Sequence, residues 1–94
     1  MENKHKKILV QLIEECGKLT RNCYDAIHFG LFARKVNQLD HTNGEKILNK
    51  YYRIQAIIEV LQSNGVLPTY SRAYIEHIKR DVYNKFGNHR KNKK

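Results

Sequence analysis

The chain has 94 residues, of which 40% are hydrophobic and 29% are charged, a balance typical of one small folded protein. With five glycines and one proline it has few of the residues that separate short strands, so the composition favours helices over a β-rich fold. It shows neither an apolar run that could span a bilayer nor a signal-peptide pattern, so we expect a cytoplasmic protein that does not enter membranes.

The formal net charge is +9, and the two ends carry much of it. The last five residues contribute +4 and the first seven contribute +2, which leaves +3 on the rest of the chain. This mild excess favours anionic ligands. We predict a single helical domain over residues 1–87 and a basic, disordered tail over residues 88–94.

The first predicted element is a long amphipathic helix from about Lys4 to His28, where apolar residues recur at steps of three and four. Gly30 follows it as a C-terminal stop. Cys16 and Cys23 lie two turns apart on this helix, too far for a disulfide, and their spacing matches no zinc pattern. We therefore expect both to be buried reduced thiols.

The second predicted helix runs from about Glu45 to Ser63. Its start is indicated by a capping box, with Thr42 as the N-cap and Glu45 reaching back to it. Gly65 is expected to end the helix in a left-handed conformation.

The third predicted helix runs from about Thr69 to Phe86, after an extended link that Pro68 enforces. The three helices predict an all-α fold, a helical hairpin plus a C-terminal helix. Because a chain of this length forms only a thin core, we expect the bundle to be completed by homo-oligomerisation.

Charged and polar stripes border the apolar faces of the first two helices. On the first helix the residues at steps of three and four are Glu14, Glu15, Lys18, Arg21, Asn22 and Asp25. On the second, Lys50 and Arg53 lie one turn apart beside Tyr51 and Tyr52. If the apolar faces pack together, these stripes meet at one rim and form a site that binds phosphate and stacks a base. An ordinary solvated helix surface has the same composition, so the pattern alone leaves both interpretations open.

Three stretches, in order along the chain, carry a resemblance to a known family. They read LIEECGKLTRNCYDAIHFGL at 12–31, HTNGEKIL at 41–48 and RIQAIIEVLQSNGVL at 53–67. The combination resembles the phage-type MazG-like nucleotide pyrophosphohydrolases and ends before the third helix. The resemblance implies a MazG-like helical bundle that assembles as a homo-oligomer, a dimer or a tetramer.

In that family, four carboxylates in an ExxE and an ExxD pair hold magnesium, which binds the nucleotide triphosphate and activates water. Among the matching positions of this chain only Glu15 remains acidic. The other three are Lys18, Lys50 and Arg53. Asp25 stands where the family has a lysine, and His28 where it has an arginine. Because lysine and arginine repel magnesium, the resemblance implies a pseudoenzyme with no metal and no other cofactor.

These replacements lead to a hypothesis about function, in which the cations of Lys18, Lys50 and Arg53 take over the metal's charge and bind phosphate directly. The chain would then be a catalytically inactive protein that binds a phosphate-containing nucleotide. The further expected ligand-binding residues are Arg21, Glu15, Asp25, His28, and, for base or sugar, Tyr51, Tyr52 and Asn43. If the protein is encoded by a phage, it would act in the host cytoplasm by sequestering a nucleotide immune signal, such as a cyclic nucleotide or an ADP-ribose derivative.

Three alternatives remain open at the level of sequence. The chain could bind nucleic acid through its basic ends and third helix. It could retain pyrophosphohydrolase activity with an unusual metal arrangement. The site could also be a decayed one, closed by Lys18 pairing with Glu14 or Glu15 and by Arg21 pairing with Asp25.

Overall fold

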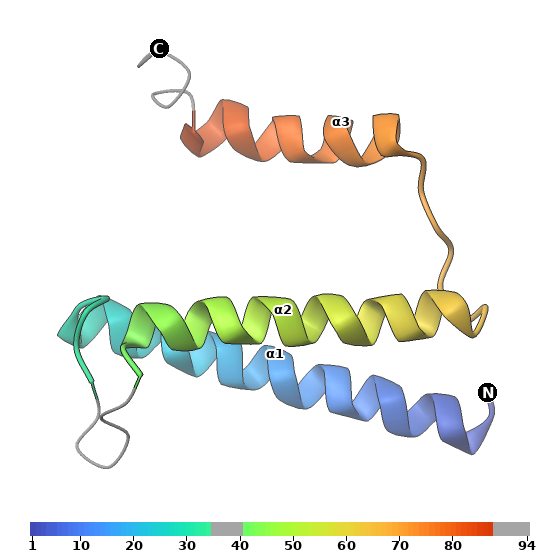
Figure 1. Ribbon diagram of the computed structural model, residues 1–94, viewed down its shortest axis with the longest axis horizontal. Helices are drawn as coiled ribbons and strands as arrows, with labels where there is room; N and C mark the ends of the chain where they lie inside the picture. The colour runs from blue at the N-terminus through green and yellow to red at the C-terminus, as the bar shows by residue number, and fades with distance from the viewer. Residues whose placement is uncertain (35–40, 88–94) are drawn as a thin grey trace.

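The computed structural model describes residues 1–34 and 41–87, and these ranges are all-α, with no strand (Figure 1). The helices are α1 (Asn3–Phe29), α2 (Asn43–Ser63) and α3 (Arg72–Val82), and a π-helical turn, η1 (Tyr83–Gly87), extends α3. The first two pack together as a hairpin, which confirms the predicted all-α class and hairpin. None of the described helices is long and apolar enough to cross a membrane. The predicted basic tail at 88–94 lies outside the described residues.

The residues predicted to end α1, and to begin and end α2, have the predicted backbone conformations and hydrogen bonds. Gly30 has a φ of 97°, the left-handed region that favours glycine, and its N–H donates to the carbonyl of Ala26 at 2.8 Å. Thr42 and Glu45 form both halves of the capping box, with hydrogen bonds of 2.9 and 3.1 Å. The bond from the Thr42 backbone N–H holds the pKa of the Glu45 carboxyl below its ordinary value. Gly65 is the second glycine with positive φ, at 76°.

The closed end of the hairpin is held by hydrogen bonds from the start of α2 to the chain that follows α1. The Asn43 backbone N–H donates to the carbonyl of Ala33, and that of Gly44 donates to Leu31, both at 2.8 Å. The Asn43 side-chain amide also donates to the Gly30 carbonyl at 3.0 Å, and the residue is 2% exposed. A Cβ at position 44 would lie 3.3 Å from the Leu31 carbonyl oxygen, so this close approach favours glycine.

The contact between α1 and α2 forms a thin core. Within the described residues Leu61 is the one buried hydrophobic side chain. The other apolar residues between the two helices are only half-buried: Ile8, Leu12, Leu19, Ile47, Ile54, Ile57 and Ile58. Cys16 and Cys23 are both exposed, so the expectation of buried thiols is wrong for a single chain. They lie on the side of α1 that α2 leaves uncovered.

The third helix begins at Arg72, three residues later than predicted, because Ser71 caps it by accepting a hydrogen bond from the Tyr74 backbone N–H at 3.1 Å. Residues 68–70 remain outside any helix after the turn at Gly65. Within the described chain α3 contacts η1 but neither α1 nor α2, and Figure 1 shows it standing apart from the hairpin. All its residues are exposed, and the molecule measures 41 × 40 × 17 Å.

Replacing Thr42 with alanine should remove the hydrogen bond that the Thr42 hydroxyl accepts from the Glu45 backbone N–H, while the bond from the residue 42 backbone N–H to the Glu45 carboxylate stays possible. We expect the free energy of unfolding to fall by about 1 kcal/mol. Chemical denaturation followed by circular dichroism at 222 nm measures this change. Thr69→Ala is the matched control, since Thr69 is exposed and lies outside the helices. Equal denaturation midpoints for the two variants would contradict the capping role.

Candidate anion-binding site

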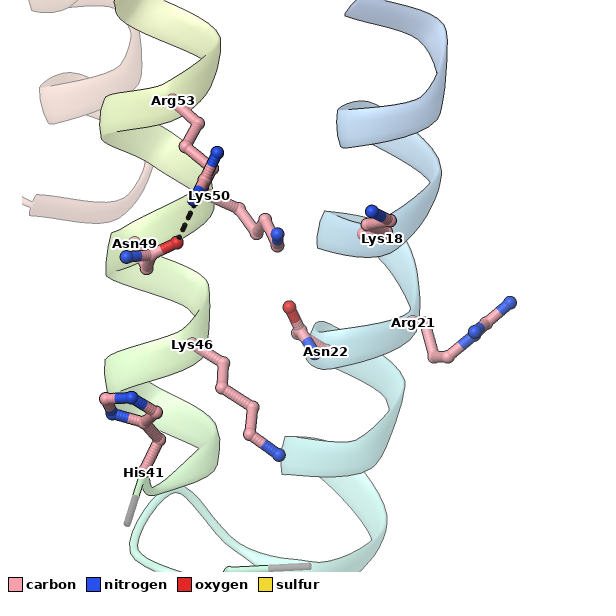
Figure 2. Close-up of a pocket in the computed structure, with 8 residues that line it drawn as sticks. All are labelled: Lys18, Arg21, Asn22, His41, Lys46, Asn49, Lys50 and Arg53. Carbon is pink, nitrogen blue, oxygen red and sulfur yellow. Dashed lines mark hydrogen bonds between the residues drawn. The ribbon is translucent and has the colours of Figure 1, made fainter. Parts of the chain in front are cut away.

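A cleft of about 540 Å³ lies between α1 and α2 on the half of the hairpin nearest the connector (Figure 2). Its volume is in the range of small-molecule sites. The residues that line it are Lys18, Arg21, Asn22, His41, Lys46, Asn49, Lys50 and Arg53. Because α1 and α2 run antiparallel, residues separated by about thirty positions in the sequence face one another across it.

The lining of the cleft is strongly basic. Among the described residues that line it, five are lysine or arginine and none is aspartate or glutamate. Figure 2 shows the amino groups of Lys46 and Lys50 and the amide of Asn22 directed into the space between the helices, whereas the Arg21 side chain is directed away from α2. Like charges held this close together raise the local positive potential, so an anion would be attracted to the cleft.

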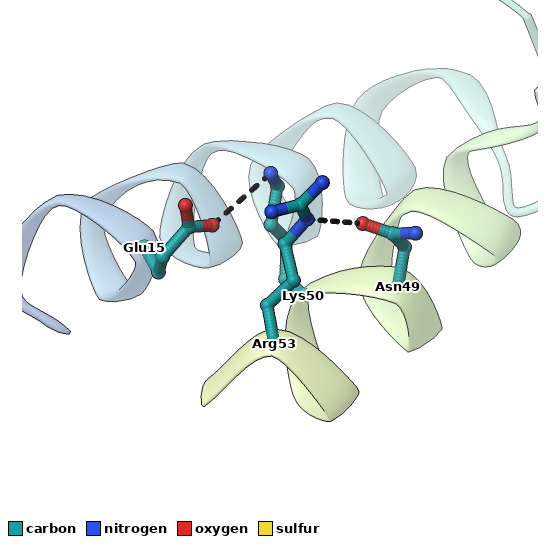
Figure 3. Close-up of polar contacts among 4 residues, drawn as sticks. All are labelled: Glu15, Asn49, Lys50 and Arg53. Carbon is teal, nitrogen blue, oxygen red and sulfur yellow. Dashed lines mark hydrogen bonds and ion pairs between the residues drawn. The ribbon is translucent and has the colours of Figure 1, made fainter. Parts of the chain in front are cut away.

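One of these cations is paired with the acid that lies beside the cleft. The Lys50 amino group is 3.1 Å from a carboxylate oxygen of Glu15, which is 4% exposed (Figure 3). The hydrogen bond from Lys50 lowers the pKa of the Glu15 carboxyl, against the effect of burial, and the positive charges of Lys50, Lys18 and Arg53 lower it further. Glu15 therefore stays ionised at neutral pH.

The remaining cations are less constrained. Arg53 donates from Nε to the side-chain oxygen of Asn49 at 3.2 Å, one turn earlier on α2, which leaves the rest of its guanidinium group available (Figure 3). Within the described ranges neither Lys18 nor Arg21 forms an ion pair. The pairs Lys18–Glu14, Lys18–Glu15 and Arg21–Asp25, on which the closed-site alternative depended, are therefore absent from the described chain. Lys50 takes the carboxylate of Glu15 instead.

The four positions that match the family's metal ligands lie together in space. Glu15 and Lys18 come from α1, and Lys50 and Arg53 come from α2. The 3.1 Å ion pair joins two of them, and the other two line the cleft and act on the pKa of Glu15. Residues more than thirty positions apart in sequence thus form one cluster.

Several of the expected ligand-binding residues do not line the cleft. Asn43 is buried in the closed end of the hairpin, and the exposed ring of His28 contacts the Tyr24 carbonyl on its own helix at 2.9 Å. Tyr51 and Tyr52 contact each other edge to face, with ring centroids 4.8 Å apart, and are absent from the lining. Asp25 is half-buried on α1 outside the lining.

Three lining residues were not predicted, His41, Lys46 and Asn49, and a fourth, Asn22, was predicted on the stripe but not among the ligand-binding residues. A signal for two of them was present, because Asn22 lies four residues after Lys18, and Lys46 lies four residues before Lys50, on the same helix faces. The side-chain oxygen of Asn22 is buried without a hydrogen-bond partner, so it offers the cleft a neutral acceptor. His41 and Asn49 follow only from the packing of the hairpin.

Within residues 1–34 and 41–87, no three histidine, cysteine, aspartate or glutamate side chains lie close enough together to hold a metal ion. The chemistry that the lining provides is the binding of anions by ammonium, guanidinium and amide groups. Comparison of the chain with protein-family models, with curated proteins and with solved structures finds no match.

Glu15→Gln should lower the free energy of unfolding by about 1 kcal/mol at pH 7, because it removes the charge that Lys50 meets in a nearly buried place. The folded protein holds the pKa of Glu15 below its unfolded value, so this stabilisation is present at neutral pH and is lost as the pH falls below about 4. Urea denaturation at pH 7 and at pH 4 should show the difference between variant and wild type narrowing at the lower pH.

Glu14→Gln is the control for this measurement, since Glu14 is the adjacent carboxylate and is exposed. It should leave stability nearly unchanged at both pH values. A Glu15→Gln protein as stable as the Glu14→Gln protein at pH 7 would show that the ion pair contributes nothing.

Proposed function

We propose that this chain is a catalytically inactive relative of the MazG-like nucleotide pyrophosphohydrolases and that it captures a phosphate-containing nucleotide in the cleft. The observation that carries the proposal is the lining itself, which contains five cationic side chains and no carboxylate among the residues that the structure describes. With Glu15 paired to Lys50, the cluster keeps a positive excess that favours a multiply charged anion.

The types of cation in the cleft suit a di- or triphosphate. Lysine ammonium groups act as point charges on phosphate oxygens, whereas the planar guanidinium of Arg53 can donate two parallel hydrogen bonds to one phosphate. Lys18 and Lys50 approach from opposite helices, so a chain of phosphates bound between them would contact both sides of the hairpin.

Binding without hydrolysis is supported by what the four clustered positions now carry. Magnesium prefers carboxylate and other hard oxygen ligands, and three of the four positions present positive charge instead. The remaining acid, Glu15, is nearly buried and is paired with Lys50. A cation in place of the metal can hold the phosphates, but it does not generate a metal-bound hydroxide.

Recognition of the sugar and base would come from the neutral groups in the lining. The side-chain amide of Asn22, which is directed into the cleft, would form a hydrogen bond with a ribose hydroxyl or a base amine. His41 provides the one ring among the lining residues, while Tyr51 and Tyr52 lie elsewhere on α2. We infer that phosphate contacts supply most of the affinity, and that a protein of this kind in a phage would remove a host nucleotide signal by capture alone.

The test is calorimetric titration of the purified chain with nucleoside triphosphates, cyclic oligonucleotides and ADP-ribose derivatives, in magnesium and in EDTA. Binding should persist in EDTA and weaken as salt is raised, because the side chains themselves meet the phosphates. Lys18→Glu combined with Arg53→Glu should abolish it, since both side chains line the cleft and neither forms an ion pair.

Arg72→Glu combined with Arg80→Glu is the matched control, because it makes the same change of charge on the exposed face of α3. This control should bind nucleotide like the wild type. If instead the chain binds DNA or RNA and only the α3 variant loses that binding, the nucleic-acid function replaces the one proposed. Magnesium-dependent turnover that Glu15→Gln removes would establish an enzyme.

A further inference from the structure

Between Leu9 and Ile27, beyond Lys6, one face of α1 carries no charged residue and is not covered by α2. At 100° per residue, the side that α2 does not cover presents a continuous strip, which we call the uncharged α1 face. Its exposed members are Val10, Ile13, Cys16, Gly17, Thr20, Cys23, Tyr24 and Ile27, and the half-buried Leu9 lies at its edge. Large apolar side chains along it are well exposed, with Ile13 at 69% and Ile27 at 75%. A solvated helix face of this length is ordinarily interrupted by charged residues.

A second uncovered apolar strip lies on α3 and η1, which we call the α3 stripe. Its members are Tyr74, Ile75, Ile78, Val82 and Phe86. They recur at three- and four-residue steps and are between 39% and 70% exposed. Within the described chain α3 contacts neither helix of the hairpin, so nothing in a single chain covers this stripe.

The surface area indicates how much is left uncovered. The chain exposes 7815 Å², against about 5,700 Å² expected for a compact monomer of its mass. Part of this excess belongs to the two uncovered strips, whose large apolar side chains are between 39% and 75% exposed. With Leu61 as the one buried hydrophobic side chain of the described residues, the single chain has too little core to account for three ordered helices.

We propose that a second copy of this chain covers both surfaces, with the α3 stripe of each copy packed on the uncharged α1 face of the other. The α3 stripe, which is about 18 Å long, fits within the length of the uncharged α1 face, which is about 27 Å. They also match in shape, because Cys16, Gly17 and Thr20 make the middle of the α1 face shallow, and a Cβ at Gly17 would meet nothing within 4 Å.

A second copy fits better than a different protein, because one reciprocal contact covers both strips at once. An acidic partner would find no cation on either strip, although the chain has a net charge of +9. The Lys18 and Asn22 side of α1, which lines the cleft, points away from the uncharged α1 face, so the proposed dimer leaves the cleft open. The inference is therefore independent of the proposed function.

Sedimentation equilibrium of the full chain tests the assembly. The wild type should have twice its chain mass of 11.2 kDa. Ile13→Asp, on the α1 face, and Ile78→Asp, on the α3 stripe, should each shift the mass to that of one chain. Ala73→Asp is the matched control, because it adds the same charge to the opposite side of α3 and should remain dimeric.

Mixing the Ile13→Asp and Ile78→Asp proteins tests the pairing itself, whether or not each folds alone. The mixture contains one undamaged contact, between the α3 of the first and the α1 of the second, so dimer mass and helical circular dichroism should recover. Contacts of α1 with α1, or of α3 with α3, predict no recovery, and that result would overturn the proposal.

The native thiols report which face is covered. Cys16 and Cys23, exposed in one chain, should react slowly with Ellman's reagent in the wild-type dimer and as fast as in urea in the Ile78→Asp protein. Fast reaction in the wild type would overturn the proposal. A wild-type monomer with protected thiols would overturn it too, because α3 would then cover α1 of its own chain.

Discussion

The hydrogen bonds at the closed end of the hairpin set the register of α2 against α1, and the cleft depends on that register. Asn43 and Gly44 attach the first turn of α2 to the carbonyls of Gly30, Leu31 and Ala33. With this end fixed and both helices straight, each α2 side chain has a determined neighbour on α1. Lys50 thereby reaches Glu15, and the cations of the two helices come to face one another. A shift of one residue would turn them by about 100° and disperse the cluster.

Local sequence signals were sufficient for much of the fold. The three- and four-residue steps of apolar residues predicted α1 and α2, and the Thr42–Glu45 box and the two left-handed glycines predicted their ends, because all of these act within a few residues. The predicted start of α3, at about Thr69, was too early, because Ser71 caps the helix by accepting a hydrogen bond from the Tyr74 backbone N–H. Which surface an amphipathic helix covers is a property of distant residues, so the separation of α3 from the hairpin had no local signal.

The candidate site was predictable in part for the same reason. Lys18, Arg21, Lys50 and Arg53 lie on stripes that periodicity identifies, and all four line the cleft. Tyr51 and Tyr52 follow Lys50 directly in sequence. Because successive residues of a helix differ by about 100° around its axis, these two rings lie on other faces of α2 than Lys50 does. Asn43 was expected to contact the ligand. Its side-chain amide instead donates a hydrogen bond to the Gly30 carbonyl, which has no partner within α1, and so holds the closed end of the hairpin together.

The ion pair between Lys50 and Glu15 would couple the binding of an anion in the cleft to the protonation of Glu15. The Lys50 ammonium group stabilises the ionised carboxylate of the nearly buried Glu15. An anion that attracts Lys50 would weaken this ion pair, and it would also add negative charge close to Glu15. Both effects raise the pKa of Glu15, so occupancy of the cleft and protonation of Glu15 favour each other. By thermodynamic reciprocity, an anion in the cleft would be bound more tightly at acidic pH values where Glu15 takes up its proton.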